Sequence, residues 1–294
     1  MKNYKVSALV VTYNRKEFLR KNLTSLVNQT YKIDTIFVVD NCSTDGTRDY
    51  VDDIIKENDN IRYITLNENI GGSGGFHEGF KAVLQENFDF LWGMDDDAIP
   101  KNDALEKMIL HAQKYTPDDK VAFYSNIWFL ENIDDINSLK KELMHEDMKK
   151  VYGISFVGFL LPRKLVEKCG LPRKDLFIFW DEVEYSDRIR ENNYEILSFR
   201  DSVIYHPYVF NPLSIKIFNK TKSIFYMPPW KYYYYIRNDI LTRKSHVRYK
   251  ENHFKYWVRL SKTLIGVLLL EPKAFGQASR GFVHGILGLS GKRH

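Results

Sequence analysis

"FLWGMDDDAIP", residues Phe90 to Pro100, is an apolar run that ends in three consecutive aspartates, Asp95, Asp96 and Asp97. A short apolar run of this kind predicts a buried strand, and buried strands are typical of a parallel sheet that is covered on both faces. In such a sheet, ligands lie beyond the carboxyl ends of the strands. The three carboxylates therefore indicate a ligand site, and the alternative interpretation is a solvated acidic turn.

The rest of the first half repeats this pattern of an apolar run followed by polar residues. Strands are predicted at residues 5–14, 34–41, 61–67, 88–94 and 120–126, and helices at 17–29, 75–87 and 101–115. This alternation predicts an α/β fold with a mostly parallel sheet flanked by helices. Further polar residues follow the other apolar runs, namely Thr12, Tyr13, Asn14, Asp40, Asn41, Asn67 and Asn69. We expect them to lie at one edge of the sheet.

The second half is predicted in less detail. Residues 129–151 are polar and charged and indicate a surface excursion or a helix, whereas residues 154–172, 176–194 and 196–207 suggest a strand or loop, a helix and a short strand. Beyond about Leu213 the chain becomes aromatic and basic, with no linker rich in Gly or Ser. We therefore expect a domain of residues 1–215 and a helical, basic extension of residues 216–294.

Charge is unevenly divided between these two parts. The net charge is +5, but residues 216–294 contain 16 Lys and Arg against three acids, and residues 1–215 contain 27 against 35. This segregation indicates an acidic body with a basic tail that faces an anionic partner.

The two cysteines, Cys42 and Cys169, lie far apart and form no C-x-x-C motif. They offer neither a disulfide framework nor a thiolate zinc site, so a reducing cytoplasm is expected. The longest late apolar run, Leu264 to Leu270, is far shorter than the roughly 20 residues that span a bilayer, so no transmembrane helix is predicted.

The aspartate triplet suggests a metal site. In an extended segment Asp95 and Asp97 share a face while Asp96 points away. Two neighbouring carboxylates repel each other unless a cation compensates the charge. Hard oxygen ligands suit Mg²⁺ or Mn²⁺, which keep few protein ligands and also bind substrate phosphates. His206 ends another apolar run and is a candidate imidazole ligand, with a purely structural histidine as the alternative.

The stretch "NENIGGSGGFHEGF", residues 67–80, is rich in glycine. Glycines allow the backbone to approach a ligand closely, and the helix that follows offers N-terminal amides to a phosphate. The stretch is no dinucleotide fingerprint, because the last required glycine is replaced by His77, and the chain has no P-loop motif. A flexible glycine turn is the alternative interpretation.

A second pair of acids, Asp181 and Glu182, follows an aromatic run at the start of a predicted helix. Asp181 with Glu184 three residues later approximates a capping box, which would reserve Asp181 for the helix terminus. Glu182 is then available as a general base for a sugar hydroxyl.

Taken together, these segments resemble the family 2 glycosyltransferases of the GT-A fold, over residues 5–245. The matching motifs occur in the family's order: "ALVVTYNR", "VVDNCSTDGT", "NENIGGSGGFHEGF", "LWGMDDDAIP", "FWDEVEYSDR", "VIYHP" and "YYIRND". Within the family, they are most similar to bacterial galactofuranosyltransferases and the related rhamnosyltransferases.

This resemblance implies the following site. The residues that bind the nucleotide-sugar donor would be Thr12, Asn14, Asp40, Asn69, Gly71, Gly72 and Asp96. The ligands of a Mn²⁺ or Mg²⁺ ion would be Asp95, Asp97 and His206. Glu182 falls on the position of the catalytic base, where aspartate is more usual, so Asp181 stays open as the alternative base.

The expected function is therefore an inverting, metal-dependent transfer of a sugar to a lipid-linked or growing cell-surface glycan. UDP-galactofuranose is favoured as the donor, and dTDP-rhamnose comes next. Residues 1–100 would form the donor half of the catalytic domain and residues 101–215 the acceptor half. The alternatives are a non-catalytic protein of the same fold that binds a nucleotide sugar or glycan, and a metal-dependent nucleotidyltransferase or phosphatase.

Residues 230–270 mix aromatic and basic residues with helical periodicity. Such a segment suits the interface of an anionic membrane, which would place the protein in the cytoplasm at the inner face of the cell membrane. The alternative is an amphipathic helix packed on the core with its charges in water. Nucleic acid is not expected as a partner, because no recognised nucleic-acid module accompanies the basic residues.

Overall fold

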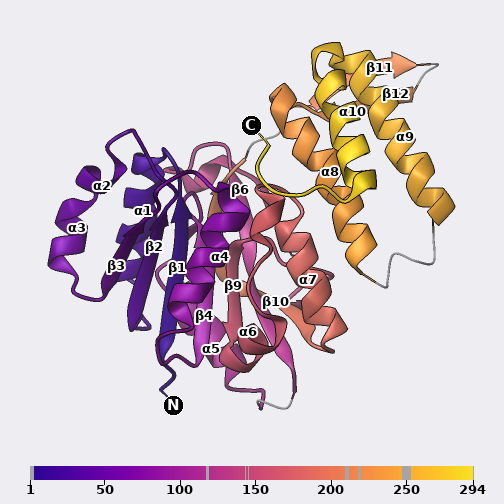
Figure 1. The fold of residues 1–294 in the computed structure, drawn as a ribbon. Coiled ribbons are helices and arrows are strands. Elements are labelled where there is room, and N and C mark those ends of the chain that lie inside the picture. The colour runs from indigo at the N-terminus through magenta and orange to yellow at the C-terminus, as the bar shows by residue number, and fades with distance from the viewer. Residues whose placement is uncertain are drawn as a thin grey trace. The chain divides into compact units, whose positions relative to one another are not determined.

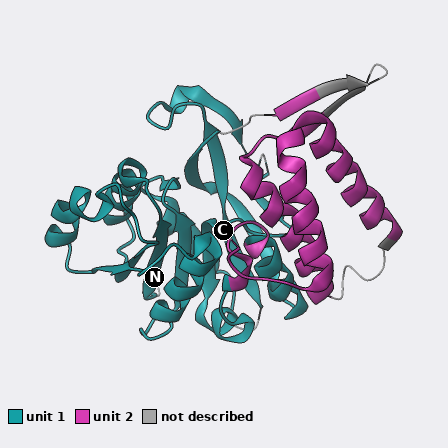
Figure 2. Cartoon of the chain, turned by 45° about the horizontal axis from the view of Figure 1, so that its top comes forward, with its two compact units in different colours: residues 1–174, 182–208 teal, residues 175–181, 209–294 magenta. Residues whose placement is uncertain are grey.

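The computed structural model describes residues 3–116, 119–142, 144, 146–208, 212–217, 220–246 and 253–293. The chain divides into two compact units (Figure 2). The first, called unit 1, comprises Met1–Lys174 and Glu182–Tyr208, and the second, unit 2, comprises Asp175–Asp181 and Val209–His294.

Unit 1 is an α/β fold around one large sheet (Figure 1). Its strands are β1 (Val6–Thr12), β2 (Thr35–Asp40), β3 (Ile61–Thr65), β4 (Phe90–Asp95), β5 (Ile99–Pro100), β6 (Val121–Leu130), β7 (Leu139–Glu142), β8 (Met148–Lys150), β9 (Val157–Pro162) and β10 (Glu195–Pro207). Its helices are α1 (Lys16–Val27), α2 (Thr47–Tyr50), α3 (Asp52–Glu57), α4 (Gly71–Val83), α5 (Ala104–Ala112) and α6 (Arg163–Cys169), with the short η1 (Ile136–Ser138). Helix α7 (Asp181–Glu191) and the short η2 (Lys174–Leu176) cross the division between the units. The α/β class is as predicted.

The parallel part of the sheet has the order β3-β2-β1-β4. Every residue of β1 is buried, as expected for a strand that is covered on both faces. The register pairs Thr12 with Asp40 and Val11 with Asp95. The polar residues at the carboxyl ends of these strands therefore lie at one edge of the sheet, as the sequence predicts.

The second part of the sheet is mixed. Strand β9 runs antiparallel to both of its neighbours, β4 and β6, whereas β6 and β10 are parallel. The sheet thus contains more antiparallel pairing than the sequence indicates. Gly93 of β4 makes room for this arrangement, because a Cβ atom there would lie 2.0 Å from the ring of Phe159 in β9.

The described residues of the polar segment 129–151 form no α-helix. The segment continues β6 and then forms η1 and the short edge strands β7 and β8, which pair with β6 and β10. The prediction of a surface excursion is correct and the helical alternative is wrong. Most of its side chains are exposed, so the segment has no apolar face that could hold a helix against the core.

The described residues of unit 2 form a hairpin and helices, namely β11 (Pro212–Ile217), β12 (Lys220–Phe225), α8 (Pro229–Ser245), α9 (His253–Leu270) and α10 (Pro272–Leu287). The predicted helical extension is confirmed, but the hairpin was not predicted, and residue 215 lies within β11. Helices α8 and α10 pack closely, because a Cβ atom on Gly281 would lie 2.3 Å from the carbonyl oxygen of Tyr233. Within the described ranges, every helix is too short or too polar to cross a membrane.

Candidate functional site

The aspartate triplet lies where β4 ends. Asp95 is the last residue of the strand and is half-buried, and its N–H donates to the carbonyl of Phe156 (2.7 Å). Asp96 and Asp97 follow outside the strand and are only 3% and 6% exposed. The carboxylates of two adjacent residues are therefore buried together, which requires nearby cations or hydrogen-bond donors to offset the loss of solvation.

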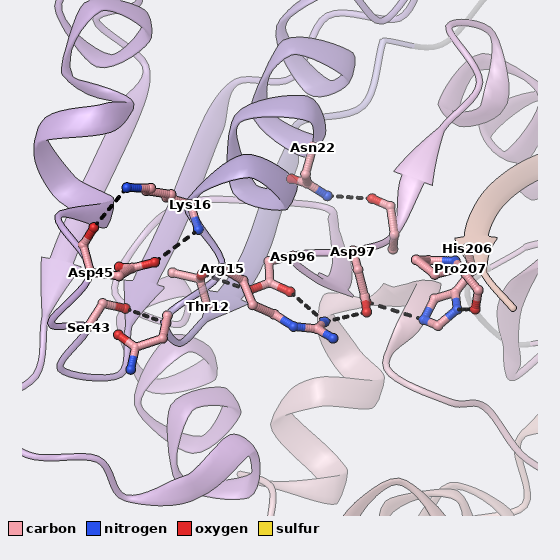
Figure 3. Close-up of polar contacts among 12 residues, drawn as sticks. Thr12, Arg15, Lys16, Asn22, Ser43, Asp45, Asp96, Asp97, His206 and Pro207 are labelled. Atoms are coloured by element: carbon pink, nitrogen blue, oxygen red, sulfur yellow. Dashed lines mark hydrogen bonds and ion pairs between the residues drawn. The ribbon is translucent and has the colours of Figure 1, made fainter. Parts of the chain in front are cut away.

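Arg15, which directly precedes α1, supplies part of this compensation (Figure 3). Its guanidinium donates to Asp96 (3.3 Å) and to Asp97, although it lies more than 80 residues away in the sequence. Asp96 also accepts a hydrogen bond from the Thr12 hydroxyl (2.7 Å). Burial, together with the neighbouring Asp97, nevertheless raises the pKa of Asp96 to about 6. Thr12 and Asp96, both predicted donor-site residues, are thus joined to each other and to Arg15.

Asp97 contacts His206 with its second oxygen. The Nε2 atom of His206 lies 3.2 Å from Asp97 Oδ1, and the Nδ1 atom faces the carbonyl of Pro207 (2.9 Å) (Figure 3). Burial opposes ionisation of Asp97, but His206 and Arg15 outweigh it and hold the pKa of Asp97 well below its usual range. Burial also disfavours the charged form of His206, but the bond to Asp97 outweighs burial and raises the pKa of the imidazole.

Asp97 and His206 fit a divalent cation. Two neighbouring ligands of an octahedral ion with bonds of about 2.1 Å lie about 3 Å apart, close to the 3.2 Å between these two atoms. With Nδ1–H donating to the Pro207 carbonyl, neutral His206 presents the Nε2 lone pair, the usual arrangement of a metal-binding histidine. Among the described residues, no three His, Cys, Asp or Glu side chains are close enough together to hold an ion. Asp95 therefore forms no such group with Asp97 and His206. Asp97 and His206 therefore suit a cation site that has few protein ligands.

The loops after β1 and β2 are tied together beside these residues. The N–H of Asn14 donates to the Ser43 hydroxyl (2.9 Å), and the N–H of Thr44 donates to Asn14 Oδ1 (2.7 Å). Asp40 is buried and accepts from the N–H of Ser43 (2.8 Å) and from the hydroxyl of Tyr63 (2.7 Å). Asn14 and Asp40, both predicted to hold the nucleoside, thus fix the loop after β2.

Two asparagines fasten the start of α4. Asn41 donates to the carbonyl of Gly71 (2.9 Å) and accepts from the N–H of Ile70 (2.9 Å). Asn69 accepts from the N–H of Gly71 (2.8 Å). These bonds satisfy polar groups at the helix N-terminus, where the helix dipole attracts anions. The structure therefore brings the predicted residues Asn69 and Gly71 next to an anion-attracting helix end.

The glycines of the stretch 67–80 lie inside the helix, whereas the sequence suggested that Gly71 to Gly74 precede the helix or form a flexible turn. Close packing explains Gly75, because a Cβ atom there would lie 2.5 Å from Cγ1 of Val11 in β1. Gly72 is different: its φ is negative and a Cβ atom would meet nothing within 4 Å. Packing therefore does not require glycine at position 72.

The second acid pair opens α7. Asp181 is buried and Glu182 is half-buried, while Glu184 is engaged by Arg188 one turn later (2.8 Å). Burial raises the pKa of the Tyr124 hydroxyl, and the carboxylates of Glu182 and Asp95 both add to this effect. Glu182 and Asp95 therefore lie within electrostatic reach of the same buried phenol in unit 1.

Sequence reasoning missed several residues at this edge of the sheet. The only sign of Arg15 in the sequence is that a basic residue follows the first predicted strand. Asn41 is indicated only by its position at the end of the second. Tyr63 lies within β3 and gives no signal at all, because its bond to Asp40 depends on the pairing of β2 with β3.

Comparison with known proteins identifies similar sequences and folds. The family model described as glycosyl transferase family 2 matches residues 7–170. The chain is 28% identical over 222 residues to the galactofuranosyltransferase GlfT1 of Mycobacterium tuberculosis, covering 69% of this chain and 70% of that protein.

Two solved structures share the fold. The structure of residues 1–349 of TarS from S. aureus in complex with UDP has a TM-score of 0.63 at 17% identity, covering 96% of this chain and 81% of that one. The mannosyltransferase PcManGT from Pyrobaculum calidifontis, in complex with GDP-Man and Mn²⁺, has a TM-score of 0.56 at 16% identity, covering 97% and 76%.

Proposed function

Because the chain belongs to glycosyl transferase family 2, we propose that this glycosyltransferase transfers a sugar from a nucleotide donor to a glycan acceptor, with inversion and with a divalent cation. The observation that carries the proposal is the group at the carboxyl edge of the sheet, in which Asp97 contacts both Arg15 and the imidazole of His206. Binding of a nucleotide alone requires no second acid, whereas α7 begins with Asp181 and Glu182.

The donor is proposed to bind along the loops after β1 and β2 and at the start of α4. Thr12, Asn14 and Asp40 would receive the nucleoside, Asp96 would support Thr12, and Asn69, Gly71 and Gly72 would line the path of the diphosphate. UDP-galactofuranose is the favoured donor, since a galactofuranosyltransferase is among the relatives and TarS binds UDP. The second candidate is dTDP-rhamnose.

Asp97 and His206 are proposed to hold Mn²⁺ or Mg²⁺. Asp95, which the family motif implies as a third ligand, forms no three-residue group with them in the described part of this structure. When bound, such an ion supplies a Lewis acid that neutralises charge on the diphosphate. PcManGT binds Mn²⁺, which supports the assignment. Arg15 adds a positive charge next to Asp97, and the N-terminal amides of α4 add partial positive charge where the diphosphate leaves.

Glu182 is proposed to act as the general base. Its carboxylate accepts the proton of an acceptor hydroxyl while that oxygen bonds to the anomeric carbon. The bond from this carbon to the diphosphate breaks on the opposite face, so the configuration inverts in one displacement. Asp181 is the alternative base, and its burial favours the structural role instead.

Unit 2 is proposed to dock on an anionic membrane at the cytoplasmic face, close to a lipid-linked acceptor. One face of α9 exposes large apolar side chains, namely Phe254, Trp257, Ile265, Leu268 and Leu269. Lys255 and Lys262 are exposed on the same helix, and basic residues next to apolar ones favour an anionic interface. Sedimentation with neutral and anionic liposomes tests the docking, and binding to neither would exclude it.

Within the catalytic domain, residues 1–100 are proposed to bind the donor and residues 101–215 the acceptor.

A screen of UDP and dTDP sugars with Mn²⁺, followed by mass and NMR analysis of the acceptor, tests the proposed function. We expect a new glycoside whose anomeric configuration is opposite to that of the donor. Donor binding without turnover would indicate a non-catalytic protein, and nucleotide release without a glycoside would indicate a nucleotidyltransferase or phosphatase. Either outcome would reject the proposal.

A further inference from the structure

The segment directly before α7 has an unusual backbone. Phe177, Phe179 and Trp180 have φ angles of 70°, 66° and 70°. The left-handed region is uncommon for residues other than glycine and is a clear outlier for bulky side chains. Three such residues within four positions persist only where the surroundings hold them, and strain of this kind clusters at functional sites.

Asn238 of α8 holds this segment through its side chain. Its Nδ2 atom lies within hydrogen-bond distance of three carbonyl oxygens, those of Leu176 (2.8 Å), Ile178 (2.8 Å) and Phe179 (3.1 Å). Its Oδ1 atom accepts from Nε of Arg237 (2.8 Å). The carboxamide is fully buried, so the carbonyls that it satisfies have no easy replacement partner in water.

Arg237, the preceding residue, fixes the start of the same segment. Its guanidinium donates to the carbonyls of Leu176 (3.0 Å), Asp175 (3.3 Å) and Gly291 (2.6 Å). The N–H of Gly291 donates in turn to the Asp175 carbonyl (2.7 Å). This arginine is also fully buried, so its cation is used to bind backbone rather than to face solvent.

Tyrosines of α8 pack against the side chains of the segment. Phe177 stacks on Tyr234, with ring centroids 4.9 Å apart. Phe179 and Trp180 both pack against Tyr235, at 5.9 Å and 6.0 Å. Helix α8 thus holds the segment in two ways. Its hydrogen bonds reach the carbonyls of Leu176, Ile178 and Phe179. Its tyrosine rings pack on the side chains of the three strained residues.

We propose that Arg237 and Asn238 are positioning residues for catalysis. They hold the backbone from Leu176 to Trp180 in its strained form, and thereby restrain the residues that lead through Asp181 directly into Glu182, the second residue of α7. This inference rests on the proposed role of Glu182 as the base. Neither Arg237 nor Asn238 is assigned a contact with substrate, so their effect is expected in turnover rather than in donor affinity.

The sharpest variant is Asn238→Asp, which keeps the shape of the side chain but removes the donors and places a carboxylate against the carbonyl oxygens. Asn238→Ala is the second variant. The matched control is Ile240→Ala, because Ile240 lies in the same helix and is buried in the core of unit 2, where a Cβ on Gly285 of α10 would lie 2.9 Å from it. The control therefore weakens unit 2 without removing a bond to the segment.

Two readouts separate positioning from stability. Both Asn238 variants are expected to increase the rate of amide hydrogen exchange selectively in residues 175–182. Ile240→Ala is expected to increase the exchange rate more widely, across α8 and α10. In kinetics, the Asn238 variants are expected to lower kcat by about 10- to 100-fold, as small misplacements of catalytic groups do. The donor Kd is expected to stay within about twofold, a free-energy change of roughly 0.4 kcal/mol.

Unchanged exchange in residues 175–182 would overturn the proposal, whatever the activity. Faster exchange with an unchanged kcat would refute the link to catalysis, and so would an equal loss of kcat in Ile240→Ala at the same folded fraction. Glu182→Gln tests the proposed base separately. Full sugar transfer by this variant would show that Glu182 is not the base. The exchange measurement would still show whether Asn238 restrains residues 176–180.

Discussion

Alanine substitutions at Gly72 and Gly75 are predicted to have opposite effects, although both residues lie at the start of α4. At position 75 the new Cβ would lie 2.5 Å from Cγ1 of buried Val11, a distance that real contacts do not show. Relieving such overpacking costs about 1–3 kcal/mol, against a gain in helix propensity of about 1 kcal/mol. The expected net loss is up to about 2 kcal/mol of unfolding free energy.

At position 72 the new methyl group meets no atom within 4 Å. Gly72→Ala should therefore leave the unfolding free energy unchanged or raise it by up to about 1 kcal/mol. If the diphosphate passes close to this backbone, however, the methyl group occupies part of its path. We expect a donor Kd at least about tenfold higher, equivalent to about 1.4 kcal/mol.

Thermal unfolding and calorimetric titration with the donor separate the two effects. For a unit of this size, about 1 kcal/mol shifts Tm by roughly 2–4 °C. Gly75→Ala should thus lower Tm by several degrees while the folded protein binds donor, and Gly72→Ala should bind donor poorly at an unchanged or higher Tm. An equal loss of Tm in both variants would refute the packing argument. An unchanged donor Kd in Gly72→Ala would refute the proposed path of the diphosphate.

Three further predictions concern the same edge of the sheet. Asp97→Ala, like removal of divalent ions from the wild type with EDTA, should abolish transfer in a product assay, and near wild-type transfer without metal would contradict the assignment. Glu182→Gln should lower kcat by at least about 100-fold at a similar donor Kd; if Asp181→Asn alone does so, the two acids have exchanged roles. Tyr63→Phe removes a 2.7 Å hydrogen bond to buried Asp40 and should cost about 1–3 kcal/mol in a denaturant titration, an effect that an unchanged midpoint would disprove.

The sequence predicts the parallel half of the fold well, because its signals are local. Apolar runs end in polar residues at Thr12, Asp40 and Asp95, and the parallel register brings those ends together. The direction of β9 could not be predicted in this way, since it depends on pairing with strands far away in the chain. The hairpin of β11 and β12 was missed because the chain beyond about Leu213 was interpreted from its overall aromatic and basic composition, and not from the alternation of polar and apolar residues in β11.

The candidate site was predicted by residue type but not by contact. The triplet was identified as a charged strand end, yet only the fold separates Asp96, bonded to Thr12, from Asp97, in contact with His206. Arg15 could not be assigned, because a single arginine after a strand gives no indication of a partner 81 residues away. The hold of Asn238 on residues 176–179 is similarly invisible in the sequence.

The most direct test of the account is a crystal soaked with donor and Mn²⁺, measured for anomalous scattering from manganese. We predict a peak about 2.1 Å from the side chains of Asp97 and His206, in contact with the donor diphosphate, and the Glu182 carboxylate on the opposite side of the anomeric carbon. A bound donor with no manganese at Asp97, its carboxylate still held by Arg15, would contradict the central claim.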